Sequence, residues 1–471
     1  MSETSATHVA VIGGGPAGYA AAFKAADLGL QVTLIDQEKN PGGVCLYRGC
    51  IPSKALLHVA KLIHETAEAS EWGLDFAAPK IDLPKMRDFK NGVIGKLTGG
   101  LGQLTRARGI TYINGRAEFA DDHSLTITGA DGESRLTADA YIVAVGSSPT
   151  KIPGISIDDP RVLDSTGALE LEDIPKSLLV IGGGYIGLEM GTVYAALGSK
   201  VTVVEMMDGI LPGADRDLAD VLAKRIDSMF DSVRLKTKVC GVKALKSGIK
   251  VSFEDAEGKA STQTFAKILV SVGRRPNSHV CGLENTGVQL DQNGFIKVDG
   301  QQRSTVPHIF AIGDIAGEPM LAHKGSHEGI VAAETIAGHA AAFEPNAIPA
   351  VVFTDPELAW CGVTESEALA RGLNVKVARF PWAASGRATT LGRNDGLTKL
   401  IIDVDSERIL GMGICGTGAG ELIAEGVLAV EMAATANDLK LSIHAHPTLS
   451  ETVMESAELF FGSSTHMYRG K

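Results

Sequence analysis

Two segments of the chain share one pattern of apolar and polar positions. Each has an apolar run, a glycine-rich turn, an alanine-rich stretch and a second apolar run that ends in an acid. The first, HVAVIGGGPAGYAAAFKAADLGLQVTLID, begins at His8, and the second, SLLVIGGGYIGLEMGTVYAALGSKVTVVE, begins at Ser177. Because a short apolar run bounded by turn residues predicts a strand, each segment predicts strand, turn, helix and strand.

A further apolar run follows each copy of the repeat, at residues 140–146 and 266–273. We therefore predict an α/β chain with two Rossmann-like dinucleotide-binding domains. Near residue 348 the pattern changes to strands of a mixed sheet with a covering helix, which predicts a C-terminal α+β domain. The predicted boundaries are residues 1–148 and 275–348 for the first domain, 149–274 for the second and 349–471 for the last.

The first glycine turn has the spacing G-x-G-x-x-G at Gly13, Gly15 and Gly18. Glycine is needed there for a tight turn, for close approach of a pyrophosphate and for contact between helix and strand. The phosphates then lie at the N-terminus of the helix, where free N–H groups attract anions. Asp36 ends the next apolar run, where a carboxylate can bind a ribose hydroxyl. The complete unit predicts a dinucleotide site.

The second turn repeats this spacing at Gly182, Gly184 and Gly187, with Glu205 as the acid. A glutamate accepts hydrogen bonds from a free ribose 2′-hydroxyl and repels a 2′-phosphate. The segment after it, MMDGILPG, contains no arginine that would bind such a phosphate. We therefore predict NAD rather than NADP at the second site. Two sites predict one dinucleotide that is held permanently and one that exchanges, as in a flavoprotein reductase.

Composition and charge exclude several classes of function. The net charge is −12 and no basic stripe contains interleaved aromatic residues, so we expect neither nucleic acid nor an anionic membrane as a partner. Hydrophobic residues make up 44% of the 471 residues, which allows a large core that needs no disulfide. The chain has no apolar run that would span a membrane, and its first residues, MSETSATH, lack the layout of a signal peptide. These features predict a cytoplasmic protein.

Two of the six cysteines, Cys45 and Cys50, lie in the segment GGVCLYRGCIPSK. The alternatives are a structural disulfide, a metal-binding pair, inert buried side chains and a redox couple. Structural disulfides are rare in a reducing compartment, and a metal site needs a second pair, whereas the other four cysteines are scattered singly. Inert burial suits those four but does not explain the close spacing of Cys45 and Cys50. We predict no metal site.

Helix geometry sets a condition for a bridge between these two cysteines. Five residues of regular helix rise about 7.5 Å, whereas the Cα atoms of a disulfide lie at most about 7 Å apart. The segment therefore cannot be a regular helix throughout, and we expect a distortion at Gly49 and Pro52 with a helix from about Ser53. A strained bridge is reduced more easily, and a thiolate near a helix start has a lowered pKa. The spacing therefore favours a redox couple.

A candidate base lies near the C-terminus, in the segment HAHPTLSE. His446 and Glu451 are separated by a proline turn that leads into a predicted helix. A carboxylate that orients an imidazole makes it a better proton acceptor, which a thiol-exchange site requires. A surface histidine beside a helix cap is the alternative interpretation.

Together, GGVCLYRGCIPSK, the two glycine units, AIGD and HAHPTLSE resemble the pyridine nucleotide–disulfide oxidoreductases over essentially the whole chain. LAHKGSHEG and FPWAASGRA are similar to bacterial members that oxidise dihydrolipoamide. The resemblance implies FAD at the first site, NAD at the second and a redox-active disulfide between Cys45 and Cys50. It also implies a homodimer with residues 349–471 as the interface, in which His446 and Glu451 serve the active site of the other subunit.

The resemblance also implies roles for individual residues. Cys45 would exchange with the substrate, and Cys50 would lie against the flavin as a thiolate. Lys54 would approach flavin N5 and pair with Glu189. The residues implied to bind the cofactors are Gly13, Gly15, Gly18, Asp36, Lys54, Gly115, Asp314, Ala322, Gly182, Gly184, Gly187, Glu205 and Gly273.

The implied reaction is the oxidation of protein-bound dihydrolipoamide to lipoamide with reduction of NAD+ to NADH. The implied partners are the lipoyl domains of 2-oxoacid dehydrogenase complexes or the lipoyl protein of glycine cleavage. One alternative is another reductase of the family, similar to glutathione reductase, which Glu205 disfavours. A second alternative is a flavin-bearing complex subunit without catalysis, which the intact cysteines, His446 and Glu451 disfavour.

The chain departs from the family's pattern at several positions. Asp36 stands where Glu is more common, and Tyr47 and Arg48 stand where Asn and Val are usual. We hypothesise that Arg48 lowers the pKa of a cysteine or shifts the potential of the pair. Tyr185 lies in the second glycine turn, where it is interpreted either as a gate for nicotinamide or as plain packing.

Overall fold

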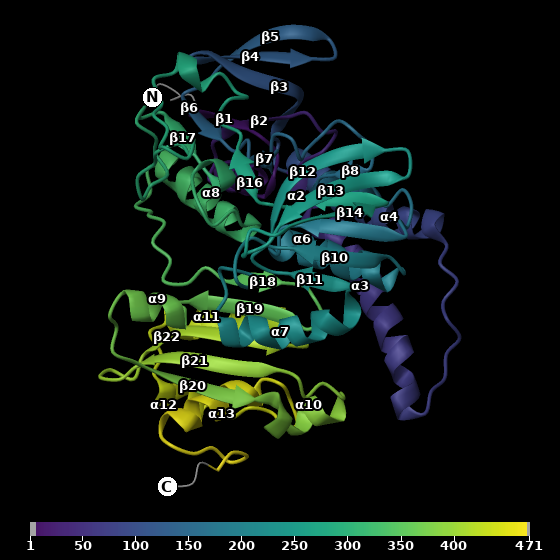
Figure 1. Ribbon diagram of the computed structural model, residues 1–471. Helices are drawn as coiled ribbons and strands as arrows, with labels where there is room; N and C mark the ends of the chain where they lie inside the picture. Colours follow the sequence, from purple (N-terminus) through teal and green to yellow (C-terminus); the bar gives the residue numbers. More distant parts are fainter. Residues whose placement is uncertain (1–5, 469–471) are drawn as a thin grey trace. The chain divides into compact units, whose positions relative to one another are not determined.

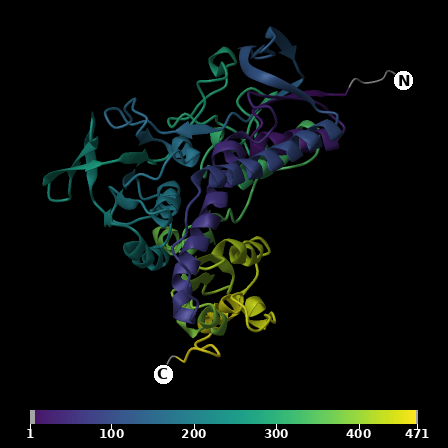
Figure 2. The same ribbon diagram turned by 90° about the vertical axis from the view of Figure 1, so that its right-hand side faces the viewer.

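The computed structural model describes residues 6–468 of the chain (Figure 1). The chain forms two compact units, each assembled from three separate stretches. The first unit comprises Met1–Leu56, Asp82–Thr150 and Gly273–Glu344, and the second comprises Leu57–Ile81, Lys151–Val272 and Pro345–Lys471. The two longest helices of the described residues, α3 (Cys50–Glu68) and α4 (Leu83–Ala107), are seen along their length in Figure 2.

The first unit is built on a seven-stranded sheet with the order β17-β6-β1-β2-β3-β4-β5. The first five strands are parallel, and β4 and β5 continue the sheet in antiparallel pairs. The bounds are β1 (His8–Ile12), β2 (Gln31–Asp36), β3 (Thr111–Asp121), β4 (Ser124–Gly129), β5 (Gly132–Thr137), β6 (Ala140–Val143) and β17 (Ile309–Ala311). A short ribbon of β7 (Ser147–Pro149) and β16 (Arg274–Pro276) belongs to the same unit.

Helices α1 (Pro16–Asp27) and α8 (Ala322–Ile336) pack closely within the first unit. A Cβ added at Gly329 would lie 2.7 Å from the carbonyl oxygen of Ala17, so glycine permits this approach. The hydroxyl of Ser326 donates a hydrogen bond to the carbonyl oxygen of Pro16 at 3.3 Å. Because Pro16 and Ser326 both lie near the start of their helices, the positive ends of two helix dipoles come together here.

The second unit contains a parallel sheet with the order β11-β10-β9-β15-β8. The bounds are β8 (Val162–Leu163), β9 (Ser177–Ile181), β10 (Lys200–Val204), β11 (Ser232–Arg234) and β15 (Lys267–Val270), with helices α5 (Ser165–Glu170), α6 (Tyr185–Ala196) and α7 (Arg216–Met229). An antiparallel sheet of β12 (Lys238–Leu245), β13 (Gly248–Glu254) and β14 (Ala260–Phe265) packs its apolar face on the parallel one. The predicted strand, turn, helix and strand are thus confirmed in both copies of the repeat.

The C-terminal part of the second unit is a five-stranded sheet with the order β18-β19-β22-β21-β20. The bounds are β18 (Ala350–Val352), β19 (Glu357–Gly362), β20 (Val375–Pro381), β21 (Leu397–Asp403) and β22 (Ile409–Gly416), with helices α9 (Glu365–Ala370), α10 (Gly386–Thr390), α11 (Ala419–Glu431), α12 (Ala436–Leu441) and α13 (Glu451–Phe460). Every pair in this sheet is antiparallel, so the predicted mixed sheet was wrong. Short connections join β18 to β19 and β21 to β22, and such connections favour antiparallel pairing.

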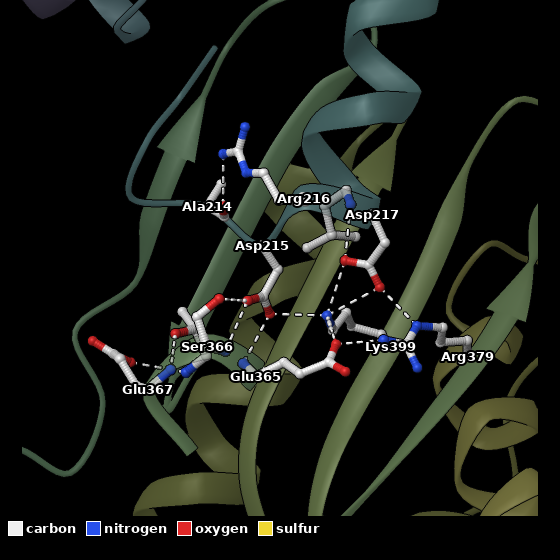
Figure 3. A network of polar contacts seen from close by, with 11 residues as sticks. Ala214, Asp215, Arg216, Asp217, Glu365, Ser366, Glu367, Arg379 and Lys399 are labelled. Carbon is white, nitrogen blue, oxygen red and sulfur yellow. Dashed lines mark hydrogen bonds and ion pairs between the residues drawn. The ribbon is translucent and has the colours of Figure 1, made fainter. Parts of the chain in front are cut away.

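One buried ammonium joins three elements of the second unit (Figure 3). Lys399 of β21 is fully buried, and its Nζ lies 2.9 Å from Asp215 and from Asp217 and 2.7 Å from Glu365. Asp215 and Asp217 stand at the start of α7, and Glu365 begins α9. Burial alone would lower the pKa of Lys399, but the hydrogen bonds to the carboxylates raise it above its ordinary value. The lysine is therefore charged and forms the centre of this network.

None of the helices among residues 6–468 combines the length and the apolar character needed to cross a bilayer.

Candidate active site

The first glycine turn lies between β1 and α1. Gly13 has a φ of +102°, a conformation that favours glycine. A Cβ at Gly18 would lie 1.8 Å from the carbonyl oxygen of Gly13, whereas a Cβ at Gly15 would meet only Gly43 Cα, at 3.9 Å. The fold itself thus requires the first and third glycines. The second leaves the N-terminus of α1 open to a phosphate, as a dinucleotide requires.

Asp36 ends β2 and reaches back to this turn. Its Oδ2 accepts a hydrogen bond from the N–H of Gly14 at 2.5 Å, and its Oδ1 accepts one from the N–H of Glu38 at 2.8 Å. Burial raises the pKa of Asp36, while the Gly14 N–H and the charge of Arg48 oppose this rise. The carboxylate therefore lies beside the glycine turn, where a ribose hydroxyl of a bound dinucleotide would meet it.

The second glycine turn has the same construction in the second unit. Gly182 has a φ of +109°, and a Cβ at Gly187 would lie 2.4 Å from the carbonyl oxygen of Gly182. At Gly184 an added Cβ would meet nothing within 4 Å. Glu205 directly follows β10, and its Oε2 accepts from the N–H of Gly183 at 2.7 Å. This turn also fits a dinucleotide, with the acid at the position that the sequence predicts.

Asp314 lies in a short 3-10 turn, Gly313–Ile315, that follows β17. The hydroxyl of Ser147 donates to Asp314 Oδ2 at 2.5 Å, and Nε of Arg274 donates to the same hydroxyl at 2.7 Å. Sequence reasoning missed Ser147 and Arg274, because each comes from a strand of the β7–β16 ribbon. For Arg274 a signal was available, because it lies in the segment GRRPN directly after the apolar run at residues 266–273.

Ala322, which the resemblance implies as a cofactor-binding residue, begins α8. One turn into this helix, Lys324 and Glu328 form a buried ion pair of 2.8 Å, and Glu328 also accepts from the N–H of Gly313 at 2.7 Å. Burial raises the pKa of Glu328, although Lys324 opposes the rise. The pair ties the start of α8 to the turn that carries Asp314. Its i,i+4 spacing in KGSHE was a signal that the sequence reasoning did not use.

Gly115 and Gly273 are two further predicted cofactor residues of the first unit. Each has a structural reason to be glycine. A Cβ at Gly115 in β3 would lie 2.9 Å from the carbonyl oxygen of Thr128 on the neighbouring strand. Gly273 has a φ of +106° and accepts a backbone hydrogen bond from Thr150 at 3.0 Å. The cofactor-binding roles of both stay predictions.

The two cysteines lie on different helices. Helix α2 (Gly43–Arg48) carries Cys45, and α3 begins at Cys50. Gly49 separates the helices with φ −145° and ψ −115°, which confirms the predicted break at this glycine. The predicted helix start near Ser53 was wrong by three residues, because Pro52 is accommodated in the first turn of α3, where no intrahelical N–H bond is lost.

The neighbouring thiols influence each other. A side-chain hydrogen bond with Cys50 and burial both raise the pKa of the Cys45 thiol, while the positive charge of Lys54 lowers it. Arg48 directs its guanidinium elsewhere, into an ion pair with Glu38. Among the causes that act on Cys45, Lys54 is the cation that favours the thiolate. Arg48 acts on Asp36, and its influence on Cys50 or on the potential of the pair stays a hypothesis.

The candidate base and its carboxylate are brought together as predicted. His446 Nδ1 lies 2.9 Å from Glu451 Oε1, and the N–H of Thr448 donates to Glu451 Oε2 at 2.8 Å. Burial raises the pKa of Glu451, but the hydrogen bonds from Thr448 and His446 lower it below its ordinary value. A carboxylate that is ionised and accepts two hydrogen bonds is suited to orient the imidazole.

Glu189 is buried in α6, and its Oε1 accepts from the N–H of Phe353 at 3.0 Å within the second unit. Lys54 belongs to the first unit. The predicted pair of Lys54 and Glu189 therefore stays a prediction.

Comparison with known proteins gives the family. Residues 7–329 match the family described as pyridine nucleotide-disulphide oxidoreductase, and residues 348–457 match its dimerisation domain. The chain belongs to the pyridine nucleotide-disulphide oxidoreductases. The predicted fold class, with FAD and NAD as cofactors, agrees with this family and is confirmed.

Curated members of the family are similar over their whole length. A dihydrolipoyl dehydrogenase of Vibrio cholerae serotype O1 is 50% identical over 471 residues, which covers 100% of this chain and 99% of the relative. One of Haemophilus influenzae is 50% identical over 474 residues, with 100% and 98% covered. The crystal structure of LpdA from Mycobacterium tuberculosis has a TM-score of 0.89 at 29% identity, and covers 96% of this chain and 99% of that one. The HOCl-induced flavoprotein disulfide reductase RclA from Escherichia coli has a TM-score of 0.86 at 27% identity, with 97% and 100% covered.

Proposed function

We propose that this oxidoreductase oxidises dihydrolipoamide to lipoamide and reduces NAD+ to NADH, the activity that gives its 50% identical relatives their name. The observation that carries the proposal is this full-length similarity. The hydrogen-bonded thiols of Cys45 and Cys50, at a glycine turn that fits a dinucleotide, support it. Glu205 beside the second turn supports NAD rather than NADP.

The proposed chemistry is thiol–disulfide exchange. His446 accepts a proton from one substrate thiol, and the resulting thiolate attacks Cys45 and breaks its bond to Cys50, which leaves as a thiolate. The second substrate sulfur then attacks the substrate sulfur of the mixed disulfide, and its proton passes to Cys45, which leaves as a thiol. Lipoamide is thereby closed, and the two electrons of the substrate remain on Cys45 and Cys50. Bound FAD would supply the two-electron chemistry that connects the cysteine pair with hydride transfer to NAD+. Glu451 holds the imidazole of His446 in position for the proton transfer.

The remaining predicted residues bind or orient the cofactors. The first glycine turn and Asp36 would bind FAD. The second glycine turn and Glu205 would bind NAD. Asp314 would hold the ribityl chain of FAD, and the positive N-terminus of α8, which begins at Ala322, would stabilise a reduced anionic flavin. Lys54 stabilises a thiolate of the cysteine pair.

The match to a dimerisation domain supports a homodimer. We assign FAD binding to residues 1–148 and 275–348, NAD binding to 149–274 and the subunit interface to 349–471. In this arrangement His446 and Glu451 of one subunit serve the cysteines of the other. The proposed partners are the lipoyl domains of 2-oxoacid dehydrogenase complexes or the lipoyl protein of glycine cleavage, and the proposed location is the cytoplasm.

One assay tests the proposed function. The purified protein is expected to be yellow and to form NADH from dihydrolipoamide and NAD+, with a much lower rate for NADP+. Cys45→Ser is expected to retain the flavin spectrum and lose the lipoamide reaction, because Cys45 is the sulfur that the substrate attacks. A flavoprotein that shows no NAD+-linked oxidation of dihydrolipoamide would contradict the proposal.

A further inference from the structure

Residues 36–40, which we call the β2 turn, are fixed on one side by the sheet of the first unit. The carbonyl oxygen of Glu38 accepts hydrogen bonds from the Tyr112 hydroxyl at 2.7 Å and from Nδ2 of Asn114 at 2.8 Å. Both donors lie on β3, the strand next to β2. The N–H of Glu38 in turn donates to Asp36. The backbone of the β2 turn is therefore anchored to its own sheet.

Helix α2 holds the β2 turn as well. The Tyr47 hydroxyl donates to the carbonyl oxygen of Asn40 at 3.0 Å, and the Arg48 guanidinium forms an ion pair with the Glu38 carboxylate. The guanidinium also lies 6.0 Å from the centroid of the Tyr47 ring, at the limit of a cation–π contact. Two adjacent residues between the redox cysteines thus direct their side chains at one turn.

The β2 turn, α2 and the first glycine turn are joined by further backbone contacts. The N–H of Gly42 donates to the carbonyl oxygen of Gly14 at 2.7 Å, and the N–H of Gly14 donates to Asp36. Arg48 also acts on Asp36 through its charge, which opposes the effect of burial on that carboxyl group. Because the Arg48 and Glu38 side chains are 38% and 30% exposed, their ion pair contributes little to global stability, and its effect is local.

We propose that Tyr47 and Arg48 are positioning residues for the adenosine end of FAD. By holding the β2 turn from the side of α2, they keep the Asp36 carboxylate directed at the glycine turn, where the ribose hydroxyl binds. The inference rests on the proposed function, because it takes FAD to be the dinucleotide of the first unit. It gives the two residues a role outside the redox chemistry of the cysteines that flank them.

The test measures how fast the purified holoenzyme releases FAD on dilution into flavin-free buffer, followed by flavin fluorescence. Loss of an exposed ion pair or of one hydrogen bond costs about 1 kcal/mol, so Arg48→Met and Tyr47→Phe should each release FAD about fivefold faster than wild type. Glu38→Gln should have a smaller effect than Arg48→Met, because Arg48 can still act on Asp36. Arg48→Lys retains the charge and should restore slow release.

Arg135→Met is the matched control, because Arg135 pairs with Asp121 on the surface of the same unit, at 2.7 Å. It should release FAD at the wild-type rate. Wild-type release rates in both Arg48→Met and Tyr47→Phe would overturn the inference, while the flavin spectrum would still support the proposed function. A larger loss of apoprotein melting temperature in Arg48→Met than in Arg135→Met would also overturn it, since the role would then be general stability. A wild-type protein that binds no FAD would instead refute the proposed function, and the inference with it.

Discussion

His446 and Glu451 are held together from the carboxylate side. The Glu451 side chain is 18% exposed and its second oxygen is bonded to the Thr448 N–H, whereas the His446 ring is 70% exposed. The carboxylate is thus fixed by its own backbone environment, and the imidazole is oriented by it. Because Glu451 does not depend on His446 for its position, the exposed imidazole can contact a second molecule and keep its orientation.

His446→Gln should lower kcat for dihydrolipoamide by about 10²–10⁴-fold, the usual contribution of a general base. Glu451→Gln should cost less, because the amide oxygen can still accept from Nδ1 but carries no charge. NADH formation under saturating substrate measures both. His123→Gln, at a histidine whose side chain is 70% exposed, is the control and should match wild type. A His446→Gln rate within about twofold of wild type would exclude this residue as the base.

Lys54→Met should slow the alkylation of Cys45 in the reduced enzyme. The positive charge of Lys54 lowers the pKa of Cys45 against the effects of Cys50 and burial. Its removal raises that pKa further, so less thiolate is present at a given pH and the pH midpoint of alkylation moves up. Iodoacetamide labelling with peptide mass spectrometry measures the rate at Cys45. Arg48→Met should react like wild type; equal slowing in both variants would show that Arg48 acts on the cysteine after all.

Two substitutions in the second glycine turn should have opposite consequences. A Cβ at Gly187 would lie 2.4 Å from the carbonyl oxygen of Gly182, so Gly187→Ala should lower the free energy of unfolding by about 1–3 kcal/mol. A Cβ at Gly184 meets nothing within 4 Å, so Gly184→Ala should keep wild-type stability and raise KM for NAD+ several-fold. Urea unfolding and steady-state kinetics separate the two effects. A Gly184→Ala variant with an unchanged KM would place the pyrophosphate elsewhere.

Lys399→Met should destabilise the second unit by about 3–5 kcal/mol at neutral pH, since it removes the buried cation shared by three carboxylates. Asp217 and Glu365 keep their ion pairs with Arg379, whereas Asp215 loses its cation. Although burial raises the pKa of Asp215 and Asp217, the hydrogen bonds from Lys399 lower both below the ordinary 3.8. Carboxyl groups with a depressed folded pKa stabilise the fold above their unfolded pKa, and this contribution is lost as the pH falls through the folded pKa. The difference from wild type should therefore narrow below about pH 3.8.

Urea unfolding of both proteins at neutral and acidic pH measures that difference. Lys267→Met is a suitable comparison, because Lys267 pairs with an Asp173 side chain that is 59% exposed. It should cost at most about 1 kcal/mol. Equal losses for the two lysines would show that burial of the Lys399 network does not strengthen its contribution.

The sequence predicted those parts of the fold that local patterns encode. Both glycine units and the break at Gly49 follow from turn chemistry and apolar runs within short segments. The contact of His446 with Glu451 was also predictable, because the two residues are five positions apart. These features need no knowledge of how distant segments meet.

The contacts that sequence reasoning missed join distant segments. Ser147 and Arg274 meet beside Asp314 only because β7 and β16 pair across 127 positions. The network around Lys399 joins β21 and the starts of α7 and α9, and Arg379 of β20 also pairs with Asp217 in it. The partner of Arg48 was missed for a different reason, since a charge between two cysteines draws attention to the cysteines and not to the preceding loop. Such pairings follow from topology, which periodicity does not specify.

The start of α2 lies directly on the first glycine turn. A Cβ at Gly43 would be 2.5 Å from Gly15 Cα, whereas the second glycine turn has no such neighbour at Gly184. The backbone of α2 therefore packs against the second glycine of the first turn, which the second turn lacks. Gly43 thus belongs to the first turn as much as Gly13 and Gly18 do, and a side chain at position 43 would disturb that turn without touching the second.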